Sequence, residues 1–129
     1  MRAVILISGN GSNLQSLIDE ARKIDLEICS VISNKENAFG LKRAERANIM
    51  THFVDPHRFK SREDFDKKLI TIIDELDINL IVLAGYMKIL SSDFINHFSG
   101  KILNIHPSLL PKFPGLNTHQ KAIDAKEKY

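Results

Sequence analysis

Apolar residues along this chain follow two patterns. Short continuous aliphatic runs are typical of buried strands, whereas spacing at i, i+3, i+4 and i+7 is typical of one face of a helix. The first pattern predicts strands at 2–7, 26–33, 51–54, 80–84 and 101–106. The second predicts helices at about 13–21, 39–47 and 61–76, a short one after Ser91 or Ser92, and a last one from His119 toward Lys126.

Strands and helices alternate throughout, which favours right-handed crossovers and a mainly parallel sheet. We therefore predict an α/β fold: a Rossmann-like three-layer sandwich with strand order 3-2-1-4-5, forming a single domain over 1–129. Ligands of such sheets bind beyond the carboxyl ends of the strands, where the winding reverses between strands one and four. The loops at 8–13, 85–90 and 104–110 should converge there.

The composition is that of an ordinary globular protein, with 43% apolar and 26% charged residues among 129. A net charge of +2 without a long Lys/Arg block gives no indication of a nucleic-acid partner. The apolar run after Arg2 is too short for a signal segment or a membrane span, so no membrane association is expected. Cys29, the one cysteine, has no disulfide partner within the chain, which fits a cytoplasmic protein.

The segment 101–115 combines a short strand with an unusually stiff exit. Asn104 and His106 are two residues apart, so both should project to the same side of the fifth strand. Three prolines follow, at 107, 111 and 114, and each fixes one backbone angle. Such a pair serves either a catalytic site or a purely structural hydrogen bond, and the segment alone leaves both open.

The loop at 8–13 reads S-G-N-G-S-N and lies between a strand and a helix start. Free N–H groups and the helix dipole favour an anion at such a place, and Ser12 or Asn13 would be the N-cap. The loop lacks the third glycine of a dinucleotide fingerprint and the Gly-Lys-Ser/Thr of a P-loop. We expect a single phosphate on a small substrate, or else a glycine turn that binds nothing.

Three segments together carry a resemblance to a known family. S-G-N-G-S-N-L at 8–14, A-G-Y-M-K-I-L at 84–90 and N-I-H-P-S-L-L-P at 104–111 occur in the order and spacing of formyltetrahydrofolate-dependent formyltransferases. The third segment is specific for that class. The first resembles, within the class, the phosphoribosylglycinamide formyltransferases.

The resemblance implies a role for particular residues. Asn104 and His106 match the catalytic pair, and Gly11, Ser12 and Asn13 match the residues that hold the ribonucleotide phosphate. The residues that match the folate-binding positions are Arg62, Met87, Lys88, Ile89, Leu90 and Asn104.

The implied reaction transfers a formyl group from 10-formyltetrahydrofolate, the co-substrate, to the amine of phosphoribosylglycinamide in purine biosynthesis. No metal is expected, because five scattered histidines and one cysteine show no ligand spacing. Three alternatives remain at this point. They are a formyltetrahydrofolate hydrolase, a methionyl-tRNA formyltransferase, and a non-catalytic module that binds a phosphate-bearing ligand.

The resemblance also implies that the chain is shorter than its family. Matching enzymes continue beyond the position of Tyr129 into a loop that supplies a catalytic aspartate and into further strands of the sheet. We therefore expect a formyltransferase domain truncated at its C-terminal end, the alternative being a natural short form that binds weakly and turns over poorly. A sheet that lacks strands exposes an edge, so we also expect self-association, with a homodimer as one form.

Overall fold

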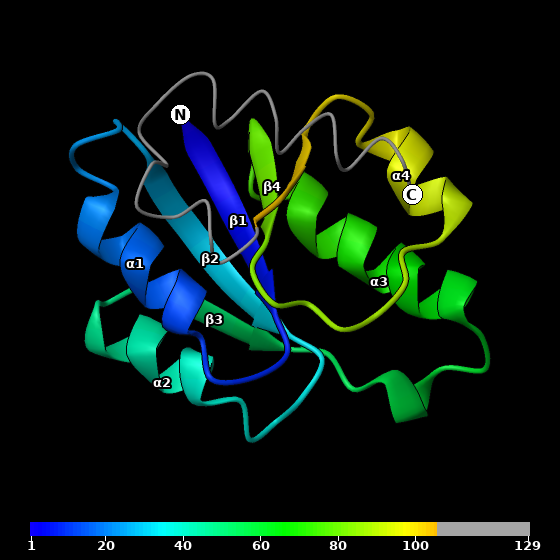
Figure 1. The fold of residues 1–129 in the computed structure, drawn as a ribbon. Coiled ribbons are helices and arrows are strands. Elements are labelled where there is room, and N and C mark those ends of the chain that lie inside the picture. Colours follow the sequence, from blue (N-terminus) through cyan, green and yellow to red (C-terminus); the bar gives the residue numbers. More distant parts are fainter. Residues whose placement is uncertain (106–129) are drawn as a thin grey trace.

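A computed structural model describes residues 1–105 of the chain (Figure 1). Within them, strands and helices alternate as predicted from the sequence. The elements are β1 (Arg2–Ile7), α1 (Ser12–Glu20), β2 (Glu27–Ser33), α2 (Phe39–Arg46), β3 (Met50–Phe53), the 3₁₀ turn η1 (Pro56–Arg58), α3 (Arg62–Asp74), β4 (Leu80–Leu83), α4 (Ser92–His97) and β5 (Ile102–Asn104). The predicted strand bounds differ from these by one residue or two where they differ at all. The helix predicted from His119 lies outside the described residues.

The five strands form one sheet in the order β3-β2-β1-β4-β5, and every neighbouring pair is parallel. At the centre of the sheet, Ile5 of β1 lies between Val31 of β2 and Val82 of β4. This order confirms the prediction. The winding reverses between β1 and β4, so the carboxyl ends of these two strands mark the switch point at which α/β sheets bind ligands.

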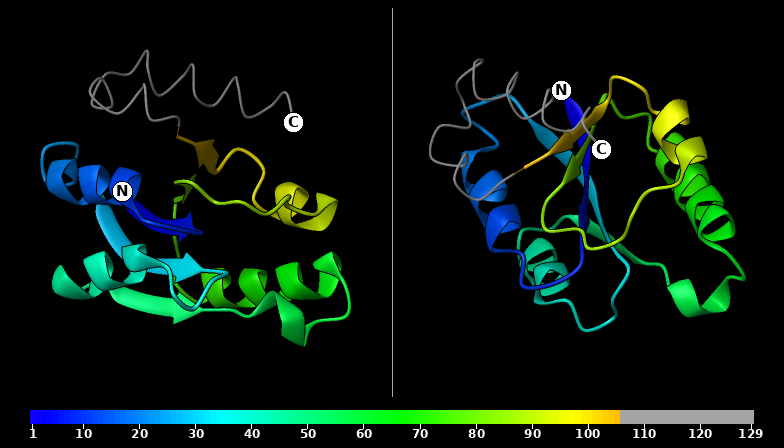
Figure 2. Two further views of the ribbon diagram at one scale, coloured as in Figure 1. Left: turned by 60° about the horizontal axis from the view of Figure 1, so that its bottom comes forward. Right: turned by 45° about the vertical axis from the view of Figure 1, so that its right-hand side comes forward.

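Helices cover both faces of the sheet, which confirms the three-layer arrangement. Figure 2 shows α1 and α2 on one side of the strands and α3 and α4 on the other. Because successive strand residues point to opposite faces, β1, β2, β4 and β5 each contribute to two cores. Ile5 and Val82 pack with Leu14 and Leu17 of α1, whereas Leu6 packs in the second core, which contains Phe65 of α3 and Phe94 of α4.

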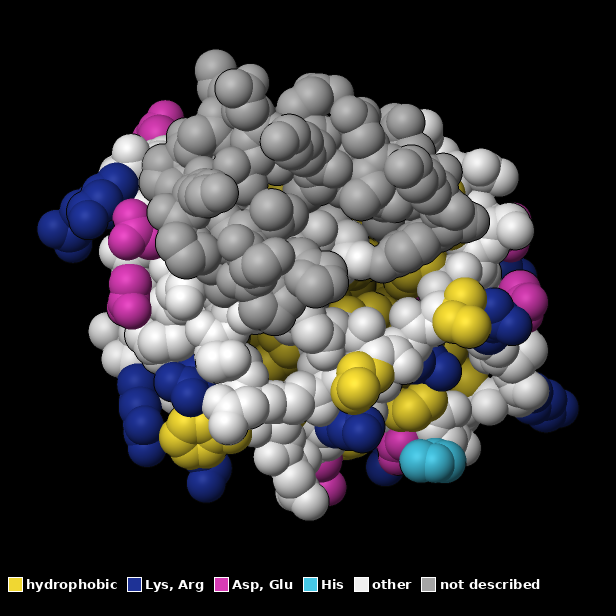
Figure 3. All heavy atoms as spheres, viewed as in Figure 1, with side chains coloured by type: hydrophobic (Ala, Val, Ile, Leu, Met, Phe, Trp, Pro, Cys, Tyr) yellow, Lys and Arg dark blue, Asp and Glu magenta, His cyan; other side chains and the backbone are white. Residues whose placement is uncertain are grey.

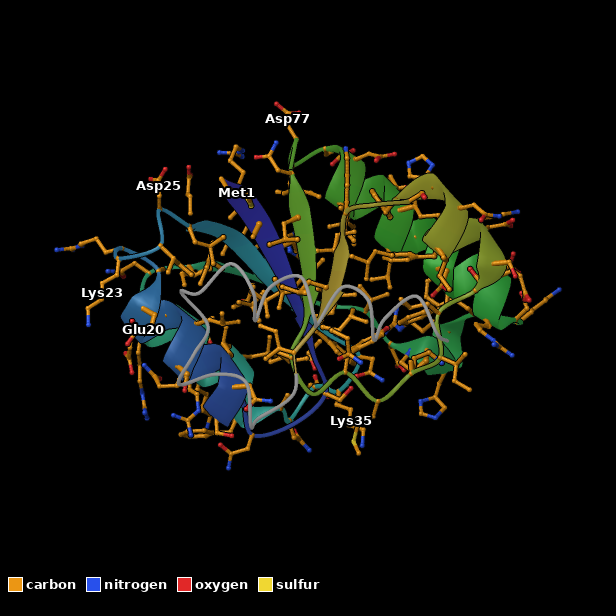
Figure 4. The ribbon with its side chains drawn as sticks, turned by 45° about the horizontal axis from the view of Figure 1, so that its top comes forward. Met1, Glu20, Lys23, Asp25, Lys35 and Asp77 are labelled. Carbon is orange, nitrogen blue, oxygen red and sulfur yellow. The ribbon has the colours of Figure 1, made fainter. Side chains whose placement is uncertain are left out.

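The amino end of the sheet is closed by hydrogen bonds between residues far apart in the sequence. The Met1 ammonium donates to the Asp25 carbonyl over 2.9 Å, and Arg2 Nε donates to the Asp77 carbonyl over 3.0 Å. Figure 4 shows Met1, Asp25 and Asp77 at this end, and Lys35, which follows β2, at the other. The candidate site therefore belongs to the end at which Lys35 lies.

The start of α1 differs from the prediction. Its N-cap is Gly11, in the left-handed conformation with φ of 80°, and the helix begins at Ser12. The prediction of Ser12 or Asn13 as N-cap was therefore wrong, because a glycine adopts this backbone conformation without the steric cost of a Cβ. Ser91 caps α4 as one of the two predicted candidates. Among the described helices, none is long and apolar enough to cross a membrane.

Candidate functional site

The loop after β1 presents the amino end of α1. The Gly11 carbonyl accepts the first helical hydrogen bond from Gln15 N over 2.8 Å, and no side chain caps the helix within residues 1–105. The N–H groups of the first turn, including those of Ser12 and Asn13, precede that bond and so have no acceptor within the helix. Together with the helix dipole they favour an anion.

A cavity of about 230 Å³ lies beside this loop. Two loops line it, one following β1 and the other following β4, so it sits at the switch point of the sheet. The lining residues are Gly9, Asn10, Gly11, Ser12, Asn13, Ala84, Gly85 and Met87. The cavity therefore brings together the three residues predicted to hold a phosphate, and it is of a size for a small polar group.

Ser8 joins the loops that follow three strands. Its hydroxyl donates to Asn34 Oδ1 over 2.7 Å and accepts from the Met87 backbone N–H over 2.8 Å. Ser8 and Asn34 are both buried. Since Ser8 follows β1, Asn34 follows β2 and Met87 lies after β4, this chain of hydrogen bonds fixes the loops relative to one another.

A second and larger hollow, of about 600 Å³, lies beside the first. Its lining comes from the end of β4, the loop after it, α4 and the end of β5. The lining residues are Leu83, Tyr86, Met87, Lys88, Ile89, Leu90, Ser92, Ile95 and Asn104. Met87 lines both hollows, so the two spaces are neighbours.

The rim of the larger hollow is apolar and basic. Met87 is 78% exposed and Ile89 is 75% exposed, which is unusual for large hydrophobic side chains. Lys88 stands between them in the sequence, and its Nζ lies 4.9 Å from the centre of the Phe65 ring. Figure 3 shows hydrophobic and basic side chains side by side over the loop between β4 and α4. Such a surface suits a flat apolar ligand that carries negative charge.

Asp66 lies buried beneath this loop. Its Oδ2 accepts the Ser91 backbone N–H over 2.6 Å, which fixes the end of the loop. Burial raises the pKa of Asp66, although the Ser91 hydrogen bond and the charges of Lys88 and Arg62 lower it in part. Burial, followed by the charge of Asp66, raises the pKa of Tyr86, so its phenol stays protonated.

The structure brings most of the predicted site residues together in two groups. Gly11, Ser12 and Asn13 line the smaller cavity. The larger hollow is lined by Met87, Lys88, Ile89, Leu90 and Asn104.

One predicted residue lies apart from these groups, and another lies outside the described residues. Arg62 is the first residue of α3, exposed, and is not among the residues that line either hollow. His106 lies outside the described residues. Asn104 is half-buried at the end of β5.

Sequence reasoning missed residues of α2 that touch the glycine loop. Gly40 and Arg43 contact Gly9 and Asn10 although they follow a different strand. No local pattern indicates such a contact, because it depends on how two helices pack. Tyr86, by contrast, lies within the segment 84–90 that carries the family resemblance, but no role was predicted for it.

Across the part of the chain that the structure describes, no group of three or more His, Cys, Asp or Glu side chains is placed to hold a metal ion. A further hollow, of about 500 Å³, lies away from the switch point, beside β3 and η1. His52 contributes to it, and burial, followed by the charge of Lys68, lowers the pKa of that imidazole.

The fold and the paired hollows define a Rossmann-like α/β protein with a small-molecule site at the carboxyl ends of its central strands. Comparison with known families agrees and is more specific. The model of the family described as formyl transferase matches residues 1–129, and the chain belongs to that family.

Individual relatives are similar over nearly the whole chain. Phosphoribosylglycinamide formyltransferase of Escherichia coli is 52% identical over 126 residues, which cover 96% of this chain and 59% of the relative. The human trifunctional purine biosynthetic protein adenosine-3 is 46% identical over 125 residues, 95% of this chain and 12% of that protein. The solved structure of the phosphoribosylglycinamide formyltransferase from Coxiella burnetii matches with a TM-score of 0.80 and 51% identity, over 98% of this chain and 60% of that one. The chain thus spans about three fifths of the length of these bacterial relatives.

Proposed function

We propose that the protein transfers a formyl group from 10-formyltetrahydrofolate to the amine of phosphoribosylglycinamide, a step of purine biosynthesis. The observation that carries the proposal is the pair of neighbouring hollows that share Met87. One is suited to a phosphate and the other to a flat apolar ligand. Family membership and relatives named phosphoribosylglycinamide formyltransferase support the same reaction.

The ribonucleotide phosphate would bind at the amino end of α1. There the N–H groups of Gly11, Ser12 and Asn13 serve as donors, and the cavity of about 230 Å³ receives the phosphate. No lysine or arginine lines this cavity among the described residues, so the backbone donors and the helix dipole supply most of the attraction.

The folate would occupy the larger hollow. Met87, Ile89 and Leu90 offer an apolar surface to the pterin ring, and Lys88 offers a positive charge on the same loop. Arg62, exposed at the start of α3, is proposed to contact the acidic part of the folate rather than the pterin. This division suits a ligand with an aromatic end and a carboxylate end.

The chemistry needs a donor for an oxyanion and a proton carrier. The substrate amine attacks the formyl carbon, and the carbonyl oxygen becomes an oxyanion in a tetrahedral intermediate. The carbon–N10 bond then breaks while N10 takes up a proton and the former amine loses one. We propose that the Asn104 side-chain amide donates to the oxyanion and that His106 carries the proton. Neither a metal nor a covalent enzyme intermediate is required.

We further propose a cytoplasmic protein that self-associates as a homodimer. The single cysteine, Cys29, is a free thiol, as suits a reducing compartment.

The homodimer is suggested by an exposed edge strand of the sheet. Two exposed apolar side chains, Met50 at 58% and Phe53 at 41%, lie on this strand, β3. Light scattering over a range of concentrations tests the homodimer, which a constant monomer mass would contradict.

The activity is tested by incubating the protein with 10-formyltetrahydrofolate and phosphoribosylglycinamide and following the loss of the formyl folate. We expect consumption that depends on the ribonucleotide. Consumption at the same rate without phosphoribosylglycinamide indicates a hydrolase instead. Binding of the ribonucleotide without any formyl transfer indicates a non-catalytic binding module.

A further inference from the structure

Helix α2 packs against the glycine loop through two glycines. The Gly40 N–H donates to the Gly9 carbonyl over 3.1 Å. A Cβ on Gly11 would lie 2.6 Å from Gly40 Cα, and a Cβ on Gly40 would lie 3.2 Å from Gly11 Cα. The two backbones therefore touch, and α2 forms the support on which the loop rests.

One side chain of α2 holds the loop directly. Arg43 Nε donates to the Asn10 carbonyl over 2.9 Å, and an Arg43 terminal nitrogen donates to Asn10 Oδ1 over 2.7 Å. The other terminal nitrogen reaches Gln15 Oε1, on α1, at 3.4 Å. The guanidinium thus binds both the residue before Gly11 and the helix after it. Its planar fork fits this arrangement in a way that an ammonium group does not.

The guanidinium is itself held in place. It lies over the ring of Phe39, with its carbon 4.9 Å from the ring centre. Arg46, one turn further along α2, lies over the same ring at 5.4 Å. Among the described residues, the Arg43 side chain forms hydrogen bonds with the loop and the Arg46 side chain forms none. The two arginines therefore share a helix, a charge and an aromatic partner, and differ in their contact with the loop.

We infer that Arg43 is a positioning residue for the ribonucleotide phosphate. By fixing Asn10 from one side, it holds Gly11 in its left-handed conformation and keeps the first-turn N–H groups of α1 aimed at the cavity. It does not line that cavity, so it acts through the loop. This inference rests on the proposed function, because it assigns the cavity to a phosphate.

The effect of Arg43 should be confined to one substrate. The larger hollow depends on the loop after β4, which is tied to Ser8 and Asp66, whereas the side-chain hydrogen bonds of Arg43 within residues 1–105 go to Asn10 and Gln15. Loss of the Arg43 hydrogen bonds to Asn10 should therefore weaken binding of phosphoribosylglycinamide and leave binding of a folate analogue unchanged. A general loss of stability would weaken both.

Isothermal titration of the wild-type chain and of Arg43→Ala, Arg43→Lys and Arg46→Ala tests this. We expect Arg43→Ala to weaken phosphoribosylglycinamide binding about tenfold or more, the scale of a lost charge-assisted hydrogen bond. Arg43→Lys keeps the charge but not the fork and should fall between Ala and wild type. Arg46→Ala should bind like wild type. Equal losses in Arg43→Ala and Arg46→Ala would overturn the inference, since charge alone would then explain the effect.

Amide hydrogen exchange separates this inference from the proposed function. If Arg43 positions the loop, the amides of Gly11, Ser12 and Asn13 exchange faster in Arg43→Ala than in Arg46→Ala, with no ligand present. Unchanged exchange at these amides would overturn the inference even if the wild type binds the ribonucleotide. A wild-type chain that binds no ribonucleotide contradicts the proposed function, and the exchange rates still decide whether Arg43 orders the loop.

Discussion

The Met87 backbone N–H donates to the Ser8 hydroxyl over 2.8 Å, which ties the loop after β4 to the loop after β1. The same hydroxyl donates to Asn34 Oδ1. A buried serine thus connects the cavity suited to a phosphate with the hollow suited to a folate, and Met87 lines both.

Ser8→Ala should lower the free energy of unfolding by about 1–3 kcal/mol, because Met87 N–H and Asn34 Oδ1 lose a buried partner. Urea denaturation measures the change. Ser16→Ala is the matched control, since the Ser16 hydroxyl makes an exposed 3.3 Å bond to the Ser12 carbonyl, and we expect a change within about 0.5 kcal/mol. Equal effects of the two substitutions would contradict the linking role.

Gly40→Ala should destabilise the protein although alanine is the better helix former. A Cβ at Gly40 would lie 2.4 Å from Cδ1 of the fully buried Ile7 and 3.2 Å from the Gly11 backbone, and overpacking of this kind costs about 1–3 kcal/mol. Among residues 1–105, a Cβ at Gly9 would have no neighbour within 4 Å, so Gly9→Ala is the control and should leave stability unchanged or slightly raised. Thermal unfolding of both variants checks this; a more stable Gly40→Ala variant refutes the close contact.

Asp66→Asn and Asp66→Ala should change the free energy of unfolding in opposite directions, with the asparagine raising it and the alanine lowering it. The asparagine keeps an acceptor for Ser91 N–H and removes a buried charge, whereas the alanine leaves that N–H without a partner, at a cost of about 1–3 kcal/mol. Burial raises the pKa of Asp66 above 3.8, so the folded state binds this proton more tightly than the unfolded chain does. Asp66 therefore makes stability fall as the pH rises above 3.8.

Denaturant unfolding at several pH values measures the Asp66 effect. The stability of Asp66→Asn relative to wild type should increase as the pH rises from 3.8 through the folded-state pKa of Asp66. Above that pKa the difference should stay constant. A difference between the two proteins that does not change with pH would show that the Asp66 charge carries no folding penalty.

His52 should destabilise the folded protein in mild acid. Burial, then the charge of Lys68, lowers the pKa of His52 below 6.5, so the unfolded chain takes up this proton first. Stability is therefore lost as the pH falls below 6.5 through the folded-state pKa. His52→Gln should unfold with less pH dependence below pH 6.5. Equal pH dependence in the variant and the wild type would exclude His52 as the source.

Asn104→Ala should lower kcat about 100-fold in formyl transfer, the usual loss on removing one oxyanion donor. In a complete chain, His106→Ala should nearly abolish turnover and leave binding of phosphoribosylglycinamide largely intact. Asn96→Ala, at an exposed position of α4, is the control and should keep the wild-type rate. A normal rate in His106→Ala would refute its catalytic role.

The strands were predictable because uninterrupted aliphatic runs such as 2–7 suit a sheet that is covered on both faces. The strand order then placed the loops at 8–13 and 85–90 side by side, and the structure confirms this through Ser8 and Met87. The N-cap of α1 was mispredicted because side-chain preference pointed to Ser12 or Asn13, whereas the tight turn needs glycine.

The role of α2 was not predictable from the sequence. Its contact with the glycine loop depends on the close approach of Gly11 and Gly40, two residues in separate elements. Arg43 looks like one of several helix-surface cations in the sequence, and its hydrogen bonds to Asn10 become visible only in the folded chain. The part of the site that local sequence patterns do not predict is therefore formed by tertiary contacts between separate elements.

The most direct measurement is isothermal titration of the 129-residue chain with phosphoribosylglycinamide, repeated with a folate analogue. We predict that the ribonucleotide binds, that inorganic phosphate competes with it, and that the folate analogue binds without displacing it. A folded chain that binds neither ligand would contradict the assignment of the two hollows.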